Sequence, residues 1–148
     1  MLCMSEHVTY STLIPGIPYK DADAAIDWLK RALGFRERAM YRNHEGIVQH
    51  AELLFGESGM LMLGTAGASP QSAQWQSLPS ELGNRVTGST YLIVPDCTPV
   101  WQKALAAKAV VLMDLRTMDY GGQSFTVRDP EGHVWSVGEY DPWAATAG

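Results

Sequence analysis

The chain alternates short apolar runs with amphipathic segments, and one order of these parts occurs twice. The segment IPYKDADAAIDWLKRALGF is an extended apolar run, an Asp, an amphipathic helical pattern and a Gly, and YLIVPDCTPVWQKALAAKAVV repeats this order. Asp21 and Asp96 are 75 positions apart, as are Gly34 and Ala109. We expect each Asp to cap a helix by accepting hydrogen bonds from its first free N–H groups. Gly34 suits the left-handed position after a helix.

Two hairpin patterns follow the helices. HAELLFGESGMLML in the first half matches QSFTVRDPEGHVWSV in the second, with Gly59 and Gly132 73 positions apart. We interpret both as a strand, a four-residue turn and a strand, with turns at 56–59 and 129–132. Each half is therefore predicted to be strand, helix and then three strands.

The sequence predicts an α+β fold made of two tandem βαβββ units in a single domain, 1–148. The first unit spans about 10–65, a linker about 66–87 and the second unit about 88–142. The linker is rich in Ser, Gly, Pro and Gln, which is typical of a loop. Trp75 stands alone in this polar stretch. We expect it either to fold over a pocket as a lid or to dock on an unrelated apolar surface.

Composition and charge argue against several classes of function. The formal net charge is −5 and the eleven basic residues are scattered, which is unlike a protein that binds nucleic acid. No run of about 18 apolar residues is present, so no membrane span is predicted. Cys3 and Cys97 form no metal-binding spacing. The first residues lack the basic and apolar regions of an export signal, and we expect a cytoplasmic protein.

Three segments carry a family resemblance. DADAAIDWLKRALGF resembles the first helix, and DYGGQSFTVRDPEGHVWSVGEYDP the last hairpin, of the glyoxalase/bleomycin resistance protein/extradiol dioxygenase superfamily, also called the vicinal oxygen chelate (VOC) superfamily. HAELLFGESGMLML resembles a glyoxalase-like subgroup of mostly unknown function. The resemblance covers about residues 10–142 and implies two units whose sheets curl into a cup around one ligand site. Many members of the superfamily are homodimers, so the resemblance also implies a homodimer. The cup would be built within one chain or across two.

Metal-dependent members of that superfamily hold a divalent ion with His, Gln or Glu on the first and last strands of each unit. The corresponding positions lie about seven residues before each capping Asp and about four after each hairpin Gly. They hold Ile14, Ser89, Leu63 and Ser136 in this chain. None of these is a usual ligand of a divalent ion. We therefore expect no metal and no other cofactor.

Hairpin register predicts which side chains line the cup. Two four-residue turns place Glu52 opposite Leu63 and Phe125 opposite Ser136, and facing residues share one side of a sheet. Trp135 is then expected on the other side, under a helix. The side chains predicted to face the cup are His50, Glu52, Ser89, Tyr91, Gln123 and Ser136 among Ile14, Leu54, Leu63, Phe125 and Val127.

His50 and Glu52 are the candidate chemical groups. Two residues apart in one strand, they lie on the same face and could act as acid and base or hold an ion in an unusual place. The alternative is a structural role, in which they form hydrogen bonds with each other or with Gln123 at the bottom of the cup. His133, facing Arg128, is expected on the outer side.

Two functions remain open. The first is a binding protein: a homodimer that holds a small, aromatic or drug-like molecule without a metal, as the bleomycin-resistance resemblance implies. Its ligand-binding residues would be Ile14, Leu54, Leu63, Trp75, Ser89, Tyr91, Gln123, Phe125 and Ser136. The second is an enzyme, a lyase or isomerase of the glyoxalase I type or a metal-free catalyst that uses His50 and Glu52. Fold alone does not decide between them.

Overall fold

The computed structural model describes residues 10–145, which form two four-stranded mixed sheets with helices. The first sheet has the order β1-β4-β3-β2 and the second the order β5-β8-β7-β6. In each, the first strand runs parallel to the last and the other pairs are antiparallel. The elements are β1 (Gly16–Tyr19), α1 (Ala22–Leu33), β2 (Arg36–Arg42), β3 (Val48–Phe55), β4 (Gly59–Thr65), η2 (Ser72–Gln74), η3 (Pro79–Leu82), β5 (Thr90–Ile93), α2 (Cys97–Ala106), β6 (Val110–Thr117), β7 (Gln123–Arg128), β8 (Val134–Gly138) and α3 (Pro142–Ala145).

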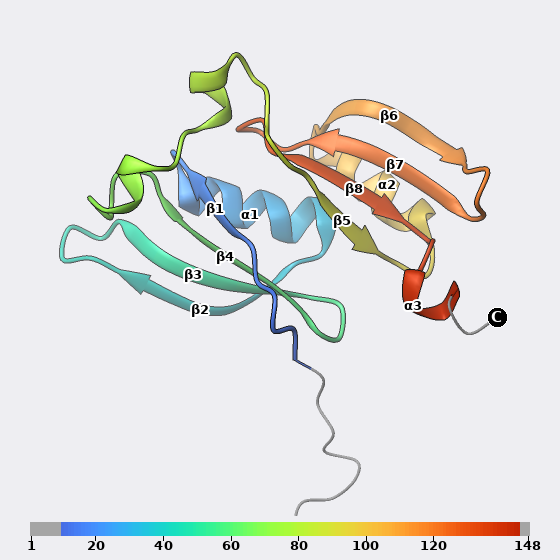
Figure 1. Cartoon of the computed structure of the whole chain (residues 1–148), viewed down its shortest axis with the longest axis horizontal. Helices are drawn as coiled ribbons and strands as arrows, with labels where there is room; N and C mark the ends of the chain where they lie inside the picture. The colour runs from blue at the N-terminus through green and yellow to red at the C-terminus, as the bar shows by residue number, and fades with distance from the viewer. Residues whose placement is uncertain (1–9, 146–148) are drawn as a thin grey trace, which may run out of the picture.

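The two sheets lie side by side, with β2 and β6 at opposite margins of the molecule and β1 and β5 near its middle (Figure 1). Helices α1 and α2 contact each other behind the strands in this view. Each sheet therefore has one face toward the helices and one face away from them, which we call the open face. This is the predicted α+β arrangement of two tandem βαβββ units with cupped sheets.

The predicted helix caps are confirmed. The Asp21 carboxylate accepts a hydrogen bond from the Ala24 N–H at 3.1 Å, and the Asp96 carboxylate accepts one from the Thr98 N–H at 3.0 Å. Gly34 ends α1 with φ 81°, in the left-handed region as expected. The second helix ends differently, because the left-handed residue there is Lys108, with φ 63°.

One hydrophobic core joins the two units. The helix-facing sides of both sheets supply buried Leu53, Leu61, Val127 and Trp135, and these belong to the same cluster as the apolar side of α1. Phe35, just after α1, packs edge-on against Trp135 of the second unit with ring centroids 5.6 Å apart. Burying such large side chains contributes about 1.5–3 kcal/mol each. The core therefore fixes the two sheets relative to one another.

Both hairpins differ from the predicted register by one residue. Phe55 pairs with Gly59 and Ala51 with Leu63, so the first loop contains three residues, not four. In the second hairpin Thr126, not Phe125, pairs with Ser136. Because side chains alternate along a strand, a slip of one residue moves the partner strand's side chains to the other face.

The linker crosses one end of both units and is anchored there. Pro79 in η3 is buried and lies against Gly132, where a Cβ would be 3.0 Å from the Pro79 Cβ. Gly132 also has φ 99°, so glycine suits this turn on two grounds. Among the helices of residues 10–145, none is both long and apolar enough to cross a membrane.

Candidate functional site

The open face of the first sheet gathers polar and apolar side chains on one surface. Strand register places Glu52 beside Met62, and Leu54 beside Met60. His50 lies two residues before Glu52 and pairs with Tyr41 of β2. These side chains are partly exposed, whereas those of the opposite face are buried against the helices. The face therefore presents an apolar surface crossed by a short polar row.

His50, Glu52 and Arg38 form that polar row. The Glu52 carboxylate accepts from Arg38 Nη1 at 2.6 Å through one oxygen, and its other oxygen lies 2.9 Å from His50 Nε2. The hydrogen bond with His50, followed by the charge of Arg38, lowers the pKa of Glu52 below its ordinary value. Glu52 is therefore a carboxylate at neutral pH, and it fixes the orientation of the His50 ring.

Two cavities flank this polar row. One, of about 420 Å³, is lined by Leu54, Met60, Arg36 and Arg38 on the sheet and by Tyr10 and Ser11 of the preceding segment. The other, of about 180 Å³, reaches from His50 and Met62 to Ser72 and Gln76 of the linker. Glu52 borders the first cavity and His50 the second, so one hydrogen-bonded pair connects both. Mostly apolar walls with a few polar groups are typical of small-molecule sites.

The second sheet has a different open face. Thr126 and Ser136 share a hydrogen bond of 2.8 Å between their hydroxyl oxygens. Tyr91 pairs with Ser136, lies across Gly138 and donates its hydroxyl hydrogen to the Tyr140 carbonyl at 2.7 Å. Burial of its ring raises the pKa of Tyr91 above the ordinary value. No described counterpart of the His50–Glu52 pair occurs on this face of residues 90–138.

The predicted cup-facing placement is wrong for Leu63, Phe125 and Val127. All three are at most 3% exposed and lie on the helix-facing sides of their sheets, because of the one-residue change in register. Leu63 borders the smaller cavity but is packed with the core. Gln123 lies two residues before Phe125 on β7 and so shares its face, not that of Thr126 and Ser136; its predicted face is therefore wrong as well.

The remaining predicted residues are spread over several places. His50, Glu52 and Leu54 lie together on the open face of the first sheet, as expected from their spacing. Ile14 precedes β1 and lines none of the cavities described for residues 10–145. Trp75 ends η2 with 71% of its surface exposed, and it lines none of the cavities described for residues 10–145. Other linker residues do line cavities: Ser72 and Gln76 border the smaller cavity beside His50, and residues 77–87 cover a further pocket.

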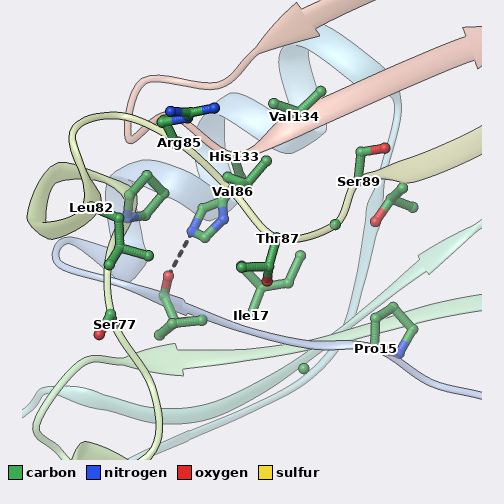
Figure 2. Close-up of a pocket in the computed structure, with 15 residues that line it drawn as sticks. Pro15, Ile17, Ser77, Leu82, Arg85, Val86, Thr87, Ser89, His133 and Val134 are labelled. Carbon is green, nitrogen blue, oxygen red and sulfur yellow. Dashed lines mark hydrogen bonds between the residues drawn. The ribbon is translucent and has the colours of Figure 1, made fainter.

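That linker pocket, of about 330 Å³, lies between β1 and the end of the linker (Figure 2). Its walls include Ile17, Leu82, Thr87 and Ser89, and His133 closes its inner side. His133 Nε2 lies 2.9 Å from the Pro18 carbonyl oxygen, as the dashed line in Figure 2 shows. Ser89 thus lies in a different cavity from His50 and Glu52. The pocket lies at the boundary between the two units, and its histidine already has a hydrogen-bond partner, the Pro18 carbonyl.

The residues present do not fit the divalent ion of metal-dependent relatives. In the observed register, Met62 and Ser136 face the cup from the last strands, with Gly16 and Tyr91 beside them on the first strands. A thioether, two hydroxyls and a glycine are not the imidazole, carboxylate or thiolate ligands of such ions. Within residues 10–145, no three His, Cys, Asp or Glu side chains are grouped to hold a metal.

Cys97 is not a nucleophile of this site. It lies buried at the start of α2, where its Sγ contacts the Gln123 and Val137 carbonyl oxygens. Burial, with the nearby charges of Glu139 and Asp96, raises the pKa of its thiol to about 11. A thiol at neutral pH reacts far more slowly than a thiolate.

Arg38 was not predicted as a site residue, and His133 lies elsewhere than the sequence predicted. Arg38 falls at a register irregularity of β2, since Glu37 pairs with Leu53 and Ala39 with Glu52. Such a bulge redirects side chains, and no turn or glycine signal marks it in the sequence. His133 was expected on the outer side, but its contacts with Tyr19 and Pro18 place it at the junction of the units. Both positions depend on contacts between distant segments.

Comparison with known proteins agrees with this geometry. The sequence profile of the Glyoxalase/Bleomycin resistance protein/Dioxygenase superfamily matches residues 6–137. The chain is 30% identical over 128 residues to the uncharacterized protein Mb0911c of Mycobacterium bovis, covering 86% of this chain and 82% of that protein.

Solved structures share the fold. TioX from Micromonospora sp. ML1 superposes with a TM-score of 0.66 at 27% identity, over 88% of this chain and 99% of that one. A Glyoxalase/bleomycin resistance protein/dioxygenase superfamily member from Sphaerobacter thermophilus gives a TM-score of 0.60 at 15% identity, over 88% of this chain and 98% of that one. The profile match and the fold together show that this chain belongs to the Glyoxalase/Bleomycin resistance protein/Dioxygenase superfamily.

Proposed function

We propose that this protein binds a small aromatic or drug-like molecule on the open face of its first sheet, without the divalent ion of metal-dependent relatives. The observation that carries the proposal is the pair of cavities, about 420 and 180 Å³, joined by the Glu52–His50 hydrogen bond. Leu54, Met60 and Met62 supply apolar contact, and methionine adapts to ligands of different shape.

The polar row suits recognition of a polar substituent on such a molecule. Arg38 and Glu52 neutralise each other, so the site has no strong preference for one charge. The second ring nitrogen of His50 has no hydrogen bond among the described residues, and it can donate or accept according to its tautomer. An aromatic ring can also extend the stack of Tyr41 on His50, whose centroids lie 6.0 Å apart.

The test is a screen followed by a blocking variant. One- and two-ring aromatic molecules are screened by ligand-observed NMR, and hits are titrated by calorimetry. Leu54→Arg places a long charged side chain in the larger cavity and should weaken binding at least tenfold. Leu105→Arg, on the exposed side of α2, is the matched control and should bind like wild type. Equal affinities for all three proteins would contradict the proposal.

We also infer that two copies associate as a homodimer, as the family resemblance implies. Exposed Val110 and Leu112 on β6, with Tyr41 on β2, leave apolar surface at the margins of both sheets. Sedimentation equilibrium should give a dimer mass that falls toward the monomer on dilution. A monomer at all concentrations would contradict association and leave the binding proposal unaffected.

A glyoxalase-type lyase or isomerase reaction is the second candidate, favoured by the carboxylate–imidazole pair. Glu52 holds His50 at 2.9 Å, and a histidine so oriented can move a proton at a bound carbon or oxygen. His50→Gln keeps a hydrogen-bonding side chain but cannot act as a base. Turnover found in a substrate screen and lost in this variant, with binding retained, would favour the enzyme over the binding protein.

A further inference from the structure

The largest of the cavities described for residues 10–145 lies elsewhere, in the cleft between the two units. This junction cleft measures about 570 Å³ and opens between the β3–β4 turn, strand β5 and the segment that leads into α3. Its floor is the core pair Phe35 and Trp135, and its rim carries Leu13 and Trp143, which are 86% and 81% exposed. Exposed apolar side chains around a concave site typically mark a binding surface.

The charge of the junction cleft is one-sided. Its lining includes the carboxylates of Glu57 and Asp141 and contains no Lys, Arg or His. Glu57 has no ion-pair or hydrogen-bond partner among the described residues. Asp141 uses one carboxylate oxygen to accept the Trp143 N–H at 2.9 Å. By contrast, the open-face cavities are mixed in charge, because Arg36, Arg38 and His50 line them together with Glu52 and Glu57.

We propose that the junction cleft is a second ligand site, which takes an aromatic or bulky apolar amine. The apolar body packs against Phe55, Tyr91 and Trp143, and the ammonium group lies beside Asp141 and Glu57. An ammonium group near aromatic faces gains a further cation–π attraction. The net charge of −5 adds a mild long-range attraction for cations. Glu57 and Met60 of the β3–β4 hairpin also border the larger open-face cavity, so the two sites are neighbours, whereas Tyr91, Asp141 and Trp143 line the junction cleft alone.

The probes are three molecules with one naphthalene body: 1-naphthylmethylamine, 1-naphthalenemethanol and 1-naphthylacetate. At pH 7 they are a cation, a neutral molecule and an anion. Titration calorimetry of the full chain should give the amine at least tenfold tighter binding than the alcohol, with the acetate weakest. Equal affinities for amine and alcohol would overturn the proposal, since the carboxylates would then contribute nothing.

Variants locate the site. Asp141→Asn retains an oxygen for the Trp143 N–H and should reduce the affinity for the amine toward that for the alcohol. Asp114→Asn on β6 removes the same charge far from the cleft and should have no effect; an equal loss in both variants would overturn the proposal. If Asp141→Asn unfolds, Glu57→Gln should likewise reduce the affinity for the amine; because Glu57 also borders the larger open-face cavity, it is measured beside Leu54→Arg, which should leave the affinity for the amine unchanged. Loss with Leu54→Arg alone would assign the amine to the open face and overturn the junction site.

Discussion

At the scale of single residues, Asp129 holds the two units together. Its carboxylate is 2% exposed, accepts the Tyr19 hydroxyl at 2.6 Å and Trp135 Nε1 at 3.1 Å through one oxygen, and accepts main-chain N–H groups of its own turn through the other. Burial, then the nearby Asp129 charge, raises the pKa of Tyr19 well above 10.0. The neutral hydroxyl is therefore the form that the folded protein requires.

Tyr19→Phe should lower the free energy of unfolding by about 1–3 kcal/mol at pH 7, because Asp129 loses a buried donor. The wild-type tyrosine has a higher pKa folded than unfolded, so its stabilisation is complete below pH 10 and declines as pH rises above it. Urea unfolding at pH 7 and pH 10.5 measures both effects. The difference between wild type and Tyr19→Phe should shrink at the higher pH, whereas exposed Tyr41→Phe should change little at either.

At the scale of elements, α1 and α2 are each followed by a residue with left-handed backbone conformation, but one is a glycine and the other a lysine. Gly34 adopts φ 81° without a side-chain penalty, but Lys108 adopts φ 63° with one. Lys108 is exposed and forms no ion pair among the described residues. Its side chain therefore adds strain and little compensating contact.

Lys108→Gly should raise the free energy of unfolding by about 0.5–1 kcal/mol. Glycine relieves the backbone strain of the folded state, and part of that gain is offset because glycine also increases the conformational entropy of the unfolded chain. Thermal unfolding followed by circular dichroism measures the change. Lys108→Ala removes the same side chain but keeps the Cβ, so it should give no such gain. Equal stabilisation by both variants would show that the charge of lysine, not its backbone conformation, is responsible.

The elements also show what the sequence could predict. The helix caps Asp21 and Asp96 depend only on neighbouring residues, so they could be predicted. The shared face of His50 and Glu52 could also be predicted, because it depends only on the alternation of side chains along a strand. The loop before Gly59 has three residues instead of four, and that single difference moved Leu63 to the other face. The Arg38 bulge and the bond between Tyr19 and Asp129, 110 positions apart, arise from tertiary packing.

At the scale of the whole molecule, the units share more than their core. Glu131 in the second unit accepts the N–H groups of Lys20 and Asp21, and Trp28 Nε1 donates to the Ala107 carbonyl at 2.8 Å. Neither unit can open without breaking these bonds and exposing core residues such as Phe35 and Trp135. We therefore propose that residues 1–148 behave as a single domain.

A single domain of this size should unfold in one step. Urea titrations followed by tryptophan fluorescence and by far-ultraviolet circular dichroism should give superimposable curves with one midpoint. Two separated midpoints would mean that the units are independent domains, despite the hydrogen bonds between them.

The proposed function requires that the open face bind its ligand without a metal ion. Its most direct test is calorimetric titration of the tightest aromatic hit into protein dialysed against EDTA, and into the same protein supplemented with Zn²⁺, Ni²⁺ or Mn²⁺. We expect equal affinities in all four samples, because Met62, Ser136, Gly16 and Tyr91 supply no set of metal ligands. Binding that disappears in EDTA and returns with one of the ions would contradict it.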